Sequence, residues 1–262
     1  MALCKFRIKY KIGKLSKKLP IIVYKITDST NTQAKICAEN GRYKNAVFIA
    51  SEQTAGRGRL GRSFISERGK GLYLSILLGE GFSSDFAVSL TTYMAVIATR
   101  VIESMTGLNP KIKWVNDIYI GEKKLSGILT EGRANADGER LDYAVVGIGI
   151  NMLSQSFDSE VKKIATSIED ECGKRLDVND LAASIIKEFF DNLYLVGSQT
   201  IAEEYKERSF LIGEYVTVIK PSGEYEATVK DITDRCELLL SLPDGTEEIL
   251  STGEVSVKKA QV

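Results

Sequence analysis

The 262-residue sequence contains no histidine. This absence excludes catalysis by Ser-His-Asp or Cys-His groups, and it excludes every metal site that needs histidine ligands. Proton transfer in this protein would therefore depend on carboxylates, lysine, tyrosine or the substrate itself.

Cysteine is scarce, and long apolar runs are lacking. The four cysteines, at positions 4, 37, 172 and 236, include no C-x-x-C pair, so neither a zinc site nor a disulfide framework is indicated. We expect a protein of the reducing cytoplasm. The N-terminus has no apolar segment of the kind found in secretion signals. Apolar runs such as 71–79 are too short to cross a membrane as helices, so we expect no membrane association.

The sequence also lacks a charge excess, because 35 basic residues balance 35 acidic ones. A chain-wide field that would gather nucleic acid is therefore not indicated. Residues 5–18 hold seven basic residues and no acidic one. This segment could contact nucleic acid, but a solvated arm is the commoner meaning of such a charge run. About twenty residues precede the first apolar strand, too few for a helix-turn-helix, and we expect no direct DNA binding.

Hydrophobic patterns predict a larger and a smaller part of the chain. In the larger part we expect strands at 21–24, 47–50, 71–79 and 141–150, a hairpin formed by 111–114, 118–120 and 125–130, and helices at 32–38, 85–105, 179–195 and 199–208. After Gly213, short strands separated by turns such as Pro221-Ser222-Gly223 are typical of a small β-barrel. We expect them at 215–219, 226–232, 237–242, 247–250 and 255–258. The predicted parts are an arm (1–20), a main domain (21–212) and a β-barrel domain (213–262).

Residues 56–62 combine three glycines with three arginines inside a long polar loop, 52–70. Glycine lets the backbone approach a ligand closely, and arginine supplies forked cationic donors for carboxylate or phosphate oxygens. A flexible linker would have no use for regularly placed arginines. Loops of this length are usually functional or disordered. We therefore predict an anion-binding loop.

Small polar residues Ser29, Thr30 and Asn31 stand where a strand meets a helix. They could bind a ligand at the helix N-terminus, although capping of the helix is the commoner role. Gly147 and Gly149 alternate in a strand, which lets another backbone or a ligand pack closely, or reflects a crowded core. A third glycine is missing, so a dinucleotide site of the Rossmann type is disfavoured.

Asp117 and Lys124 stand on either side of the predicted hairpin turn. The carboxylate could hold Mg²⁺, and the ammonium suits a phosphate or carboxylate. Alternatively, the two side chains form a surface ion pair that contributes little to stability.

Taken together, the order and spacing of these segments resemble biotin protein ligases, also called biotin–[acetyl-CoA-carboxylase] ligases. The resemblance extends from residue 21 to residue 258. It rests on residues 29–31, the loop at 56–62, the Lys-Trp-x-Asn-Asp segment at 113–117, the Lys-Leu-x-Gly-Ile-Leu strand at 124–129 and the segment at 147–151. Val115 and Ser126 depart from the family pattern, in which proline and a smaller residue are common.

The resemblance implies an α+β fold. A mixed β-sheet with flanking helices, as in class II aminoacyl-tRNA synthetases and biotin synthetases, would be followed by an SH3-like small β-barrel. Domain 21–212 would bind biotin and ATP. The DNA-binding repressor domain of some family members would be lacking.

The resemblance also implies an ATP-dependent ligase. Biotin and MgATP would give biotinyl-5′-AMP and pyrophosphate, and biotin would then pass to a lysine on the biotin carboxyl carrier domain of a biotin-dependent carboxylase. Neither step needs an enzyme nucleophile, which agrees with the absence of histidine. The family includes monomers and homodimers, so a homodimer stays open.

Three residues are implied as catalytic: Lys124 would polarise the reacting groups, Arg59 would retain the adenylate, and Asp117 would bind Mg²⁺ or orient the incoming lysine. The loop at 56–62 would act as a lid. The implied biotin-binding residues are Ser29, Thr30, Asn31, Gln53, Gly56, Arg57, Gly58, Arg59, Lys124 and Gly127. The implied ATP-binding residues are Arg57, Arg59, Asn116, Asp117, Lys124 and Asn151.

Two other functions compete with this one. A lipoate or octanoate ligase shares the fold family and would need a long acyl pocket, but the glycine–arginine loop argues against it. A biotin sensor without turnover would not need Arg57, Arg59, Asp117 and Lys124, all of which are present.

Overall fold

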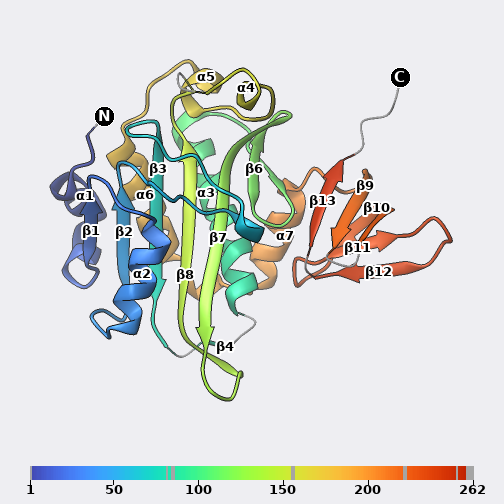
Figure 1. Ribbon diagram of the computed structural model, residues 1–262, viewed down its shortest axis with the longest axis horizontal. Coiled ribbons are helices and arrows are strands. Elements are labelled where there is room, and N and C mark those ends of the chain that lie inside the picture. The colour runs from blue at the N-terminus through green and yellow to red at the C-terminus, as the bar shows by residue number, and fades with distance from the viewer. Residues whose placement is uncertain are drawn as a thin grey trace.

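The computed structural model describes residues 2–80, 82–83, 86–154, 157–220, 223–251 and 253–257. Two β-sheets organise these residues, a larger one that is flanked by helices and a smaller one formed by the C-terminal segment (Figure 1). The strands of the larger sheet are β1 (Ile21–Tyr24), β2 (Ala46–Ala50), β3 (Gly71–Leu78), β4 (Phe82–Ser83), β5 (Lys111–Lys113), β6 (Asp117–Ile120), β7 (Lys123–Ala134) and β8 (Arg140–Asn151).

The larger sheet has the order β1-β2-β3-β8-β7-β6-β5, and β4 pairs with β8. β1 and β2 run parallel, whereas the other pairs are antiparallel. The mixed sheet that the resemblance implied is therefore confirmed. This order brings β7 and β8 to the middle of the sheet, where the predicted site segments of both strands lie side by side.

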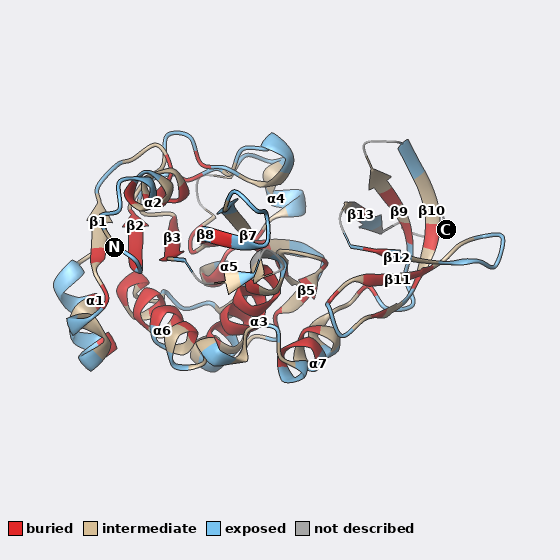
Figure 2. Ribbon diagram, turned by 90° about the horizontal axis from the view of Figure 1, so that it is seen from below, coloured by how far each residue is buried: buried red, intermediate tan, exposed pale blue. Residues whose placement is uncertain are grey.

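Helices cover both faces of the larger sheet (Figure 2). Helices α1, α3 and α6 lie against one face, and α2 lies against the other. The helices are α1 (Lys5–Ile12), α2 (Thr30–Glu39), α3 (Phe86–Thr106), α4 (Val161–Ile164), α5 (Ile168–Cys172), α6 (Val178–Asp191) and α7 (Gln199–Arg208). Short 3₁₀ turns occur at η1 (Gly13–Lys17), η2 (Arg59–Gly61) and η3 (Leu193–Leu195). None of the described helices combines the length and apolarity that crossing a membrane requires.

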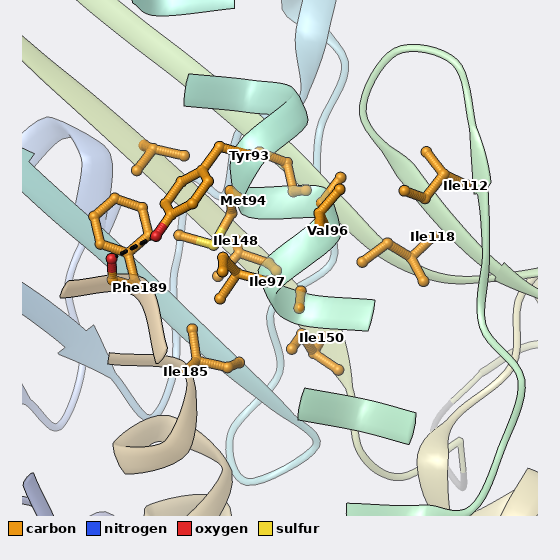
Figure 3. Close-up of a cluster of buried hydrophobic side chains, with 14 of the residues drawn as sticks. Tyr93, Met94, Val96, Ile97, Ile112, Ile118, Ile148, Ile150, Ile185 and Phe189 are labelled. Atoms are coloured by element: carbon orange, nitrogen blue, oxygen red, sulfur yellow. Dashed lines mark hydrogen bonds between the residues drawn. The ribbon is translucent and has the colours of Figure 1, made fainter. Parts of the chain in front are cut away.

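The main core lies between the sheet and helix α3. The helical spacing of apolar residues in α3 predicted this, and Leu90, Met94 and Ile97 are fully buried. Tyr93 is also buried, and its hydroxyl donates to the Phe189 carbonyl at 2.6 Å, so its one polar group is satisfied (Figure 3). The predicted first residue of this helix, Asp85, lies outside the described residues.

The interpretation of residues 5–18 as a solvated arm is wrong for helix α1. Ile8 and Ile12 are 0% and 3% exposed, and α1 packs against α6. Arg7 adds an ion pair with Asp177 at 2.7 Å. The two isoleucines are four residues apart and therefore share one helix face, a short signal that the many lysines concealed.

The C-terminal segment forms a five-stranded antiparallel sheet of order β12-β11-β10-β9-β13. Its strands are β9 (Tyr215–Lys220), β10 (Gly223–Ile232), β11 (Leu238–Ser241), β12 (Glu247–Leu250) and β13 (Glu254–Val257). The five predicted strands are confirmed, while the predicted turn residues Pro221 and Ser222 and the last strand residue, Lys258, lie outside the described residues. Trp114 ties this sheet to the main sheet, because its indole N–H donates to the Cys236 carbonyl at 2.8 Å.

Candidate functional site

A pocket on the α2 side of the main sheet collects residues from all the predicted site segments. Every predicted site residue except Gly56 and Asn151 lines it. The lining residues are Ser29, Thr30, Asn31, Gln53, Arg57, Gly58, Arg59, Arg62, Ser63, Phe64, Asn116, Asp117, Lys124, Gly127, Ile128, Leu129, Gly147, Ile148 and Gly149. Segments that are more than a hundred residues apart in the sequence thus meet in one place.

The start of helix α2 is held by a glutamine rather than by a serine cap. Ser29 occupies the N-cap position, but its side chain makes no capping hydrogen bond. Instead, the backbone N–H and the hydroxyl of Thr30 both lie within hydrogen-bond distance of Gln53 Oε1, at 2.8 and 3.1 Å. Capping, the commoner role expected of this segment, is therefore wrong for the Ser29 side chain. Gln53 instead links the helix start to the polar loop.

Asn31 is buried at the floor of the pocket, where the protein holds both ends of its amide. Its Nδ2 donates to the Leu129 carbonyl at 3.1 Å and to Glu131 Oε2 at 2.9 Å. Its Oδ1 accepts from the Ser75 hydroxyl at 2.6 Å. The orientation of this amide is therefore fixed from both ends.

The alternating glycines of β8 make room for side chains of the protein. A methyl group at Gly147 would lie 2.1 Å from Asn31 Oδ1, and one at Gly149 would lie 2.5 Å from the Phe64 ring. Both distances are far below normal contact, so each glycine allows a pocket residue to lie against the sheet. The atoms that lie against these glycines belong to side chains, not to another backbone.

The glycine–arginine loop is a hydrogen-bonded hairpin. Arg57 forms an antiparallel bridge with Ser63, and the Phe64 N–H donates to the Gly56 carbonyl at 2.9 Å. A methyl group at Gly56 would lie 2.3 Å from the Phe64 carbonyl oxygen, so Gly56 is needed for the loop's own packing. Leu60 has a φ of 51°, a left-handed conformation at the tip of the hairpin.

Arg57 and Arg59 make different contacts. Arg59 donates from Nη1 to Asn116 Oδ1 at 3.2 Å and from Nη2 to the Gly253 carbonyl at 3.1 Å. Arg57 instead lies with Nη2 3.1 Å from Glu131 Oε1. Arg59 therefore connects the loop to the C-terminal sheet, and Arg57 connects the loop to β7.

Lys124 and Asp117 form an ion pair across the hairpin, with 2.7 Å between Nζ and Oδ2. The simpler of the two expectations for these residues is thus met, and the pair borders the pocket. The other carboxylate oxygen, Asp117 Oδ1, is buried and has no hydrogen-bond partner in the described chain. A buried oxygen without a partner is unusual in a folded protein, and this one can accept a hydrogen bond from a ligand or coordinate a cation.

Glu131, which was not among the predicted site residues, lies beside the pocket, whereas the predicted residue Asn151 lies apart from it. Glu131 contacts both Asn31 and Arg57, and its position two residues after Leu129 on the same strand face was the available signal. Burial alone would raise the pKa of the Glu131 carboxyl, but hydrogen bonds from Lys35 and Asn31 and the nearby positive charges hold this pKa below its usual value.

Asn151 donates to the Thr166 carbonyl at 3.0 Å, outside the pocket lining.

Residues 23–151 match a family model described as the biotin/lipoate A/B protein ligase family, and residues 211–258 match one described as the biotin protein ligase C terminal domain. The bifunctional ligase/repressor BirA of Bacillus spizizenii is 32% identical over 236 residues, which cover 88% of this chain and 72% of that protein.

Two further similarities cover nearly all of the related protein. The biotin–[acetyl-CoA-carboxylase] ligase of Paracoccus denitrificans is 28% identical over 230 residues, 85% of this chain and 95% of the relative. Among solved structures, the biotin protein ligase of Aquifex aeolicus in complex with biotin and ATP aligns with a TM-score of 0.77 and 26% identity, covering 92% of this chain and 99% of that one.

Proposed function

This chain belongs to the biotin protein ligase family, and on that premise we propose that it activates biotin as biotinyl-5′-AMP and transfers biotin to a lysine of a biotin carboxyl carrier domain. The observation that carries the proposal is the convergence of Arg57, Arg59, Arg62 and Lys124 on one pocket. The first step brings together two anions, a carboxylate and a triphosphate. Cations already fixed where charge accumulates are the main way to lower such a barrier.

Lys124 is proposed to contact both reacting groups, the biotin carboxylate and the α-phosphate. Its ammonium group is held at the pocket edge by Asp117, at 2.7 Å, and only about a third of its side chain is exposed. A held ammonium loses less entropy on binding an anion than a solvated one. Asp117 would then also lie close to the acceptor lysine in the second step.

Mg²⁺ is proposed to accompany ATP, with Asp117 as its protein ligand. The unpartnered, buried Oδ1 of Asp117 fits this role. One carboxylate is enough, because Mg²⁺ bound with nucleotides takes most of its other ligands from phosphates and water. The ion would supply neutralisation of the triphosphate charge.

The far end of the pocket is proposed to receive the ureido ring of biotin. Ser29, Thr30, Asn31 and Gln53 present small polar groups there, and Gly58 and Gly127 leave space for the ligand between them. We propose that ATP contacts Asn116, Arg57 and Arg59. We also propose that Asn151, at the end of β8, lies on the ATP side of the site. For Gly56 we propose only a structural role, because a side chain at this position would clash with the rest of the loop.

Residues 21–212 are proposed as the catalytic domain, with residues 1–20 before it and the C-terminal domain at 213–262. The four cysteines are free, which supports the proposal of a cytoplasmic protein. No direct DNA binding is proposed.

Release of pyrophosphate from MgATP tests this proposal directly. We expect release with biotin, and a mass increase of one biotinyl group on a carrier-domain lysine when that domain is added. Release with lipoate but not biotin would instead assign the protein to the lipoate ligases. A protein that binds biotin without releasing pyrophosphate would be a sensor.

A further inference from the structure

A carboxylate beneath the pocket, Glu131, connects two of the residues that line it. Glu131 lies on β7, and its side chain is only 17% exposed. Alternate residues of a strand share one face of the sheet, so Glu131 lies on the same face as Gly127 and Leu129, which border the pocket. Each of its two carboxylate oxygens has different partners.

Oε2 of Glu131 fixes the direction of the Asn31 amide. It accepts from Asn31 Nδ2 at 2.9 Å, and the Leu129 carbonyl takes the second hydrogen of the same amide at 3.1 Å. Reversing the amide would place its oxygen against a carboxylate and a carbonyl, both of which only accept. Asn31 Oδ1 receives one hydrogen bond, from Ser75, and keeps a second lone pair. Asn31 can therefore offer a ligand an acceptor but no donor.

Oε1 of Glu131 gathers two cations. Lys35 Nζ lies at 2.7 Å and Arg57 Nη2 at 3.1 Å. Lys35 is one helical turn beyond Asn31 on α2, so both side chains reach the same carboxylate. Two positive charges against one negative charge leave the cluster with a net positive charge. Glu131 therefore holds Arg57 at the pocket wall without cancelling the attraction for an anionic ligand.

From these contacts we propose that Glu131 is a positioning residue for biotin specificity. Its carboxylate keeps the Asn31 acceptor turned toward the N–H groups of the ureido ring and holds Arg57 at the pocket wall. This inference rests on the proposed function. It adds the reason why a ligand with N–H donors at that position is selected.

Pyrophosphate release by Glu131→Gln and by Lys35→Met tests the proposal. Glutamine keeps the size of Glu131 but loses the charge and places an N–H₂ group among donors. We expect the KM for biotin to rise about tenfold or more. The KM for ATP should rise less, because Arg57 is the only partner of Glu131 that is also proposed to contact ATP. Lys35→Met leaves the contacts with Asn31 and Arg57 in place, and we expect its KM for biotin to stay near that of the unmodified protein. An unchanged KM in Glu131→Gln, or equal increases in both variants, would overturn the proposal.

A second measurement uses biotin methylated on a ureido nitrogen, which lacks one N–H donor. The unmodified protein is expected to prefer biotin in kcat/KM, and Glu131→Gln is expected to reduce that preference about fivefold or more. A preference unchanged by the substitution would contradict the role of Glu131 in orienting Asn31. If Glu131→Gln does not fold, Glu131→Asp is measured instead, since it keeps the charge on a shorter side chain, and it is expected to raise the KM for biotin while retaining the preference. Absence of pyrophosphate release by the unmodified protein would instead refute the proposed function.

Discussion

Adding one methyl group at Gly147 should displace Asn31 and weaken biotin binding. The methyl carbon of Gly147→Ala would lie 2.1 Å from Asn31 Oδ1, and a Cβ atom essentially never lies closer than 3.0 Å to a non-bonded heavy atom. Asn31 must therefore retreat by about 1 Å, or helix α2 must move away from β8 locally. A shift of that size breaks at least one of its hydrogen bonds to Ser75, Leu129 and Glu131.

The expected loss of stability combines two effects. Inserting a methyl group into a packed site costs about 1–3 kcal/mol, and each lost hydrogen bond costs about 1 kcal/mol. A total of about 2–4 kcal/mol corresponds to a fall in melting temperature of roughly 4–16 °C for a protein of this size. Because the acceptor atom of Asn31 moves, the KM for biotin should rise about tenfold or more.

Thermal melting and pyrophosphate release measure these two effects. Gly127→Ala is the matched control for stability, because its methyl group would meet its nearest neighbour, in the Lys124 side chain, at an ordinary 3.4 Å. In an Asn31→Ala background the Gly147 methyl group meets no amide, so adding it should cost little further stability. If Gly147→Ala melts within about 1 °C of the unmodified protein and keeps its KM for biotin, the packing argument is wrong.

Lys124→Ala should lower the single-turnover rate of adenylate formation by two or more orders of magnitude, roughly the effect of removing one preorganised charge, and an unchanged rate would exclude Lys124 from the chemistry. Arg59→Ala removes the contacts with Asn116 and Gly253, and should release biotinyl-5′-AMP into solution faster; no increase in free adenylate would count against Arg59 as a lid residue. The lowered pKa of Glu131 predicts a stabilising contribution that is present above its usual pKa near 4.5 and is lost as the pH falls below it. Acid titration of stability should therefore be less steep in Glu131→Gln, and identical curves would refute this. Burial, together with the nearby Asp117, raises the pKa of Tyr119 to about 12, so its contribution is present below the ordinary value near 10 and is lost as the pH rises toward 12. A Tyr119→Phe variant should lack that alkaline loss in thermal melts, and an equal loss would contradict the assignment.

Residue types and their spacing were enough to predict most of the residues that line the pocket. The glycine–arginine loop, the hairpin with Asp117 and Lys124, and the segment at 29–31 were each recognisable from residue types and spacing, and all of them border one pocket. Apolar spacing also gave the buried face of α3 and the strands of the C-terminal sheet. These features are local, because backbone preferences and side-chain periodicity act over a few residues.

The contacts among those residues depend on how distant segments of the chain pack together. Asn31 meets Glu131 a hundred positions later, and Arg59 reaches Gly253 at a separation of 194. The pairing of β7 with β8 sets Leu129 opposite Gly147, so that both residues lie against Asn31 at the pocket floor. Such contacts depend on strand register and on the shape of neighbouring side chains. Neither is encoded in any one segment of the chain. Most residues of the pocket could therefore be predicted, whereas the Glu131 carboxylate that contacts Asn31 and Arg57 could not.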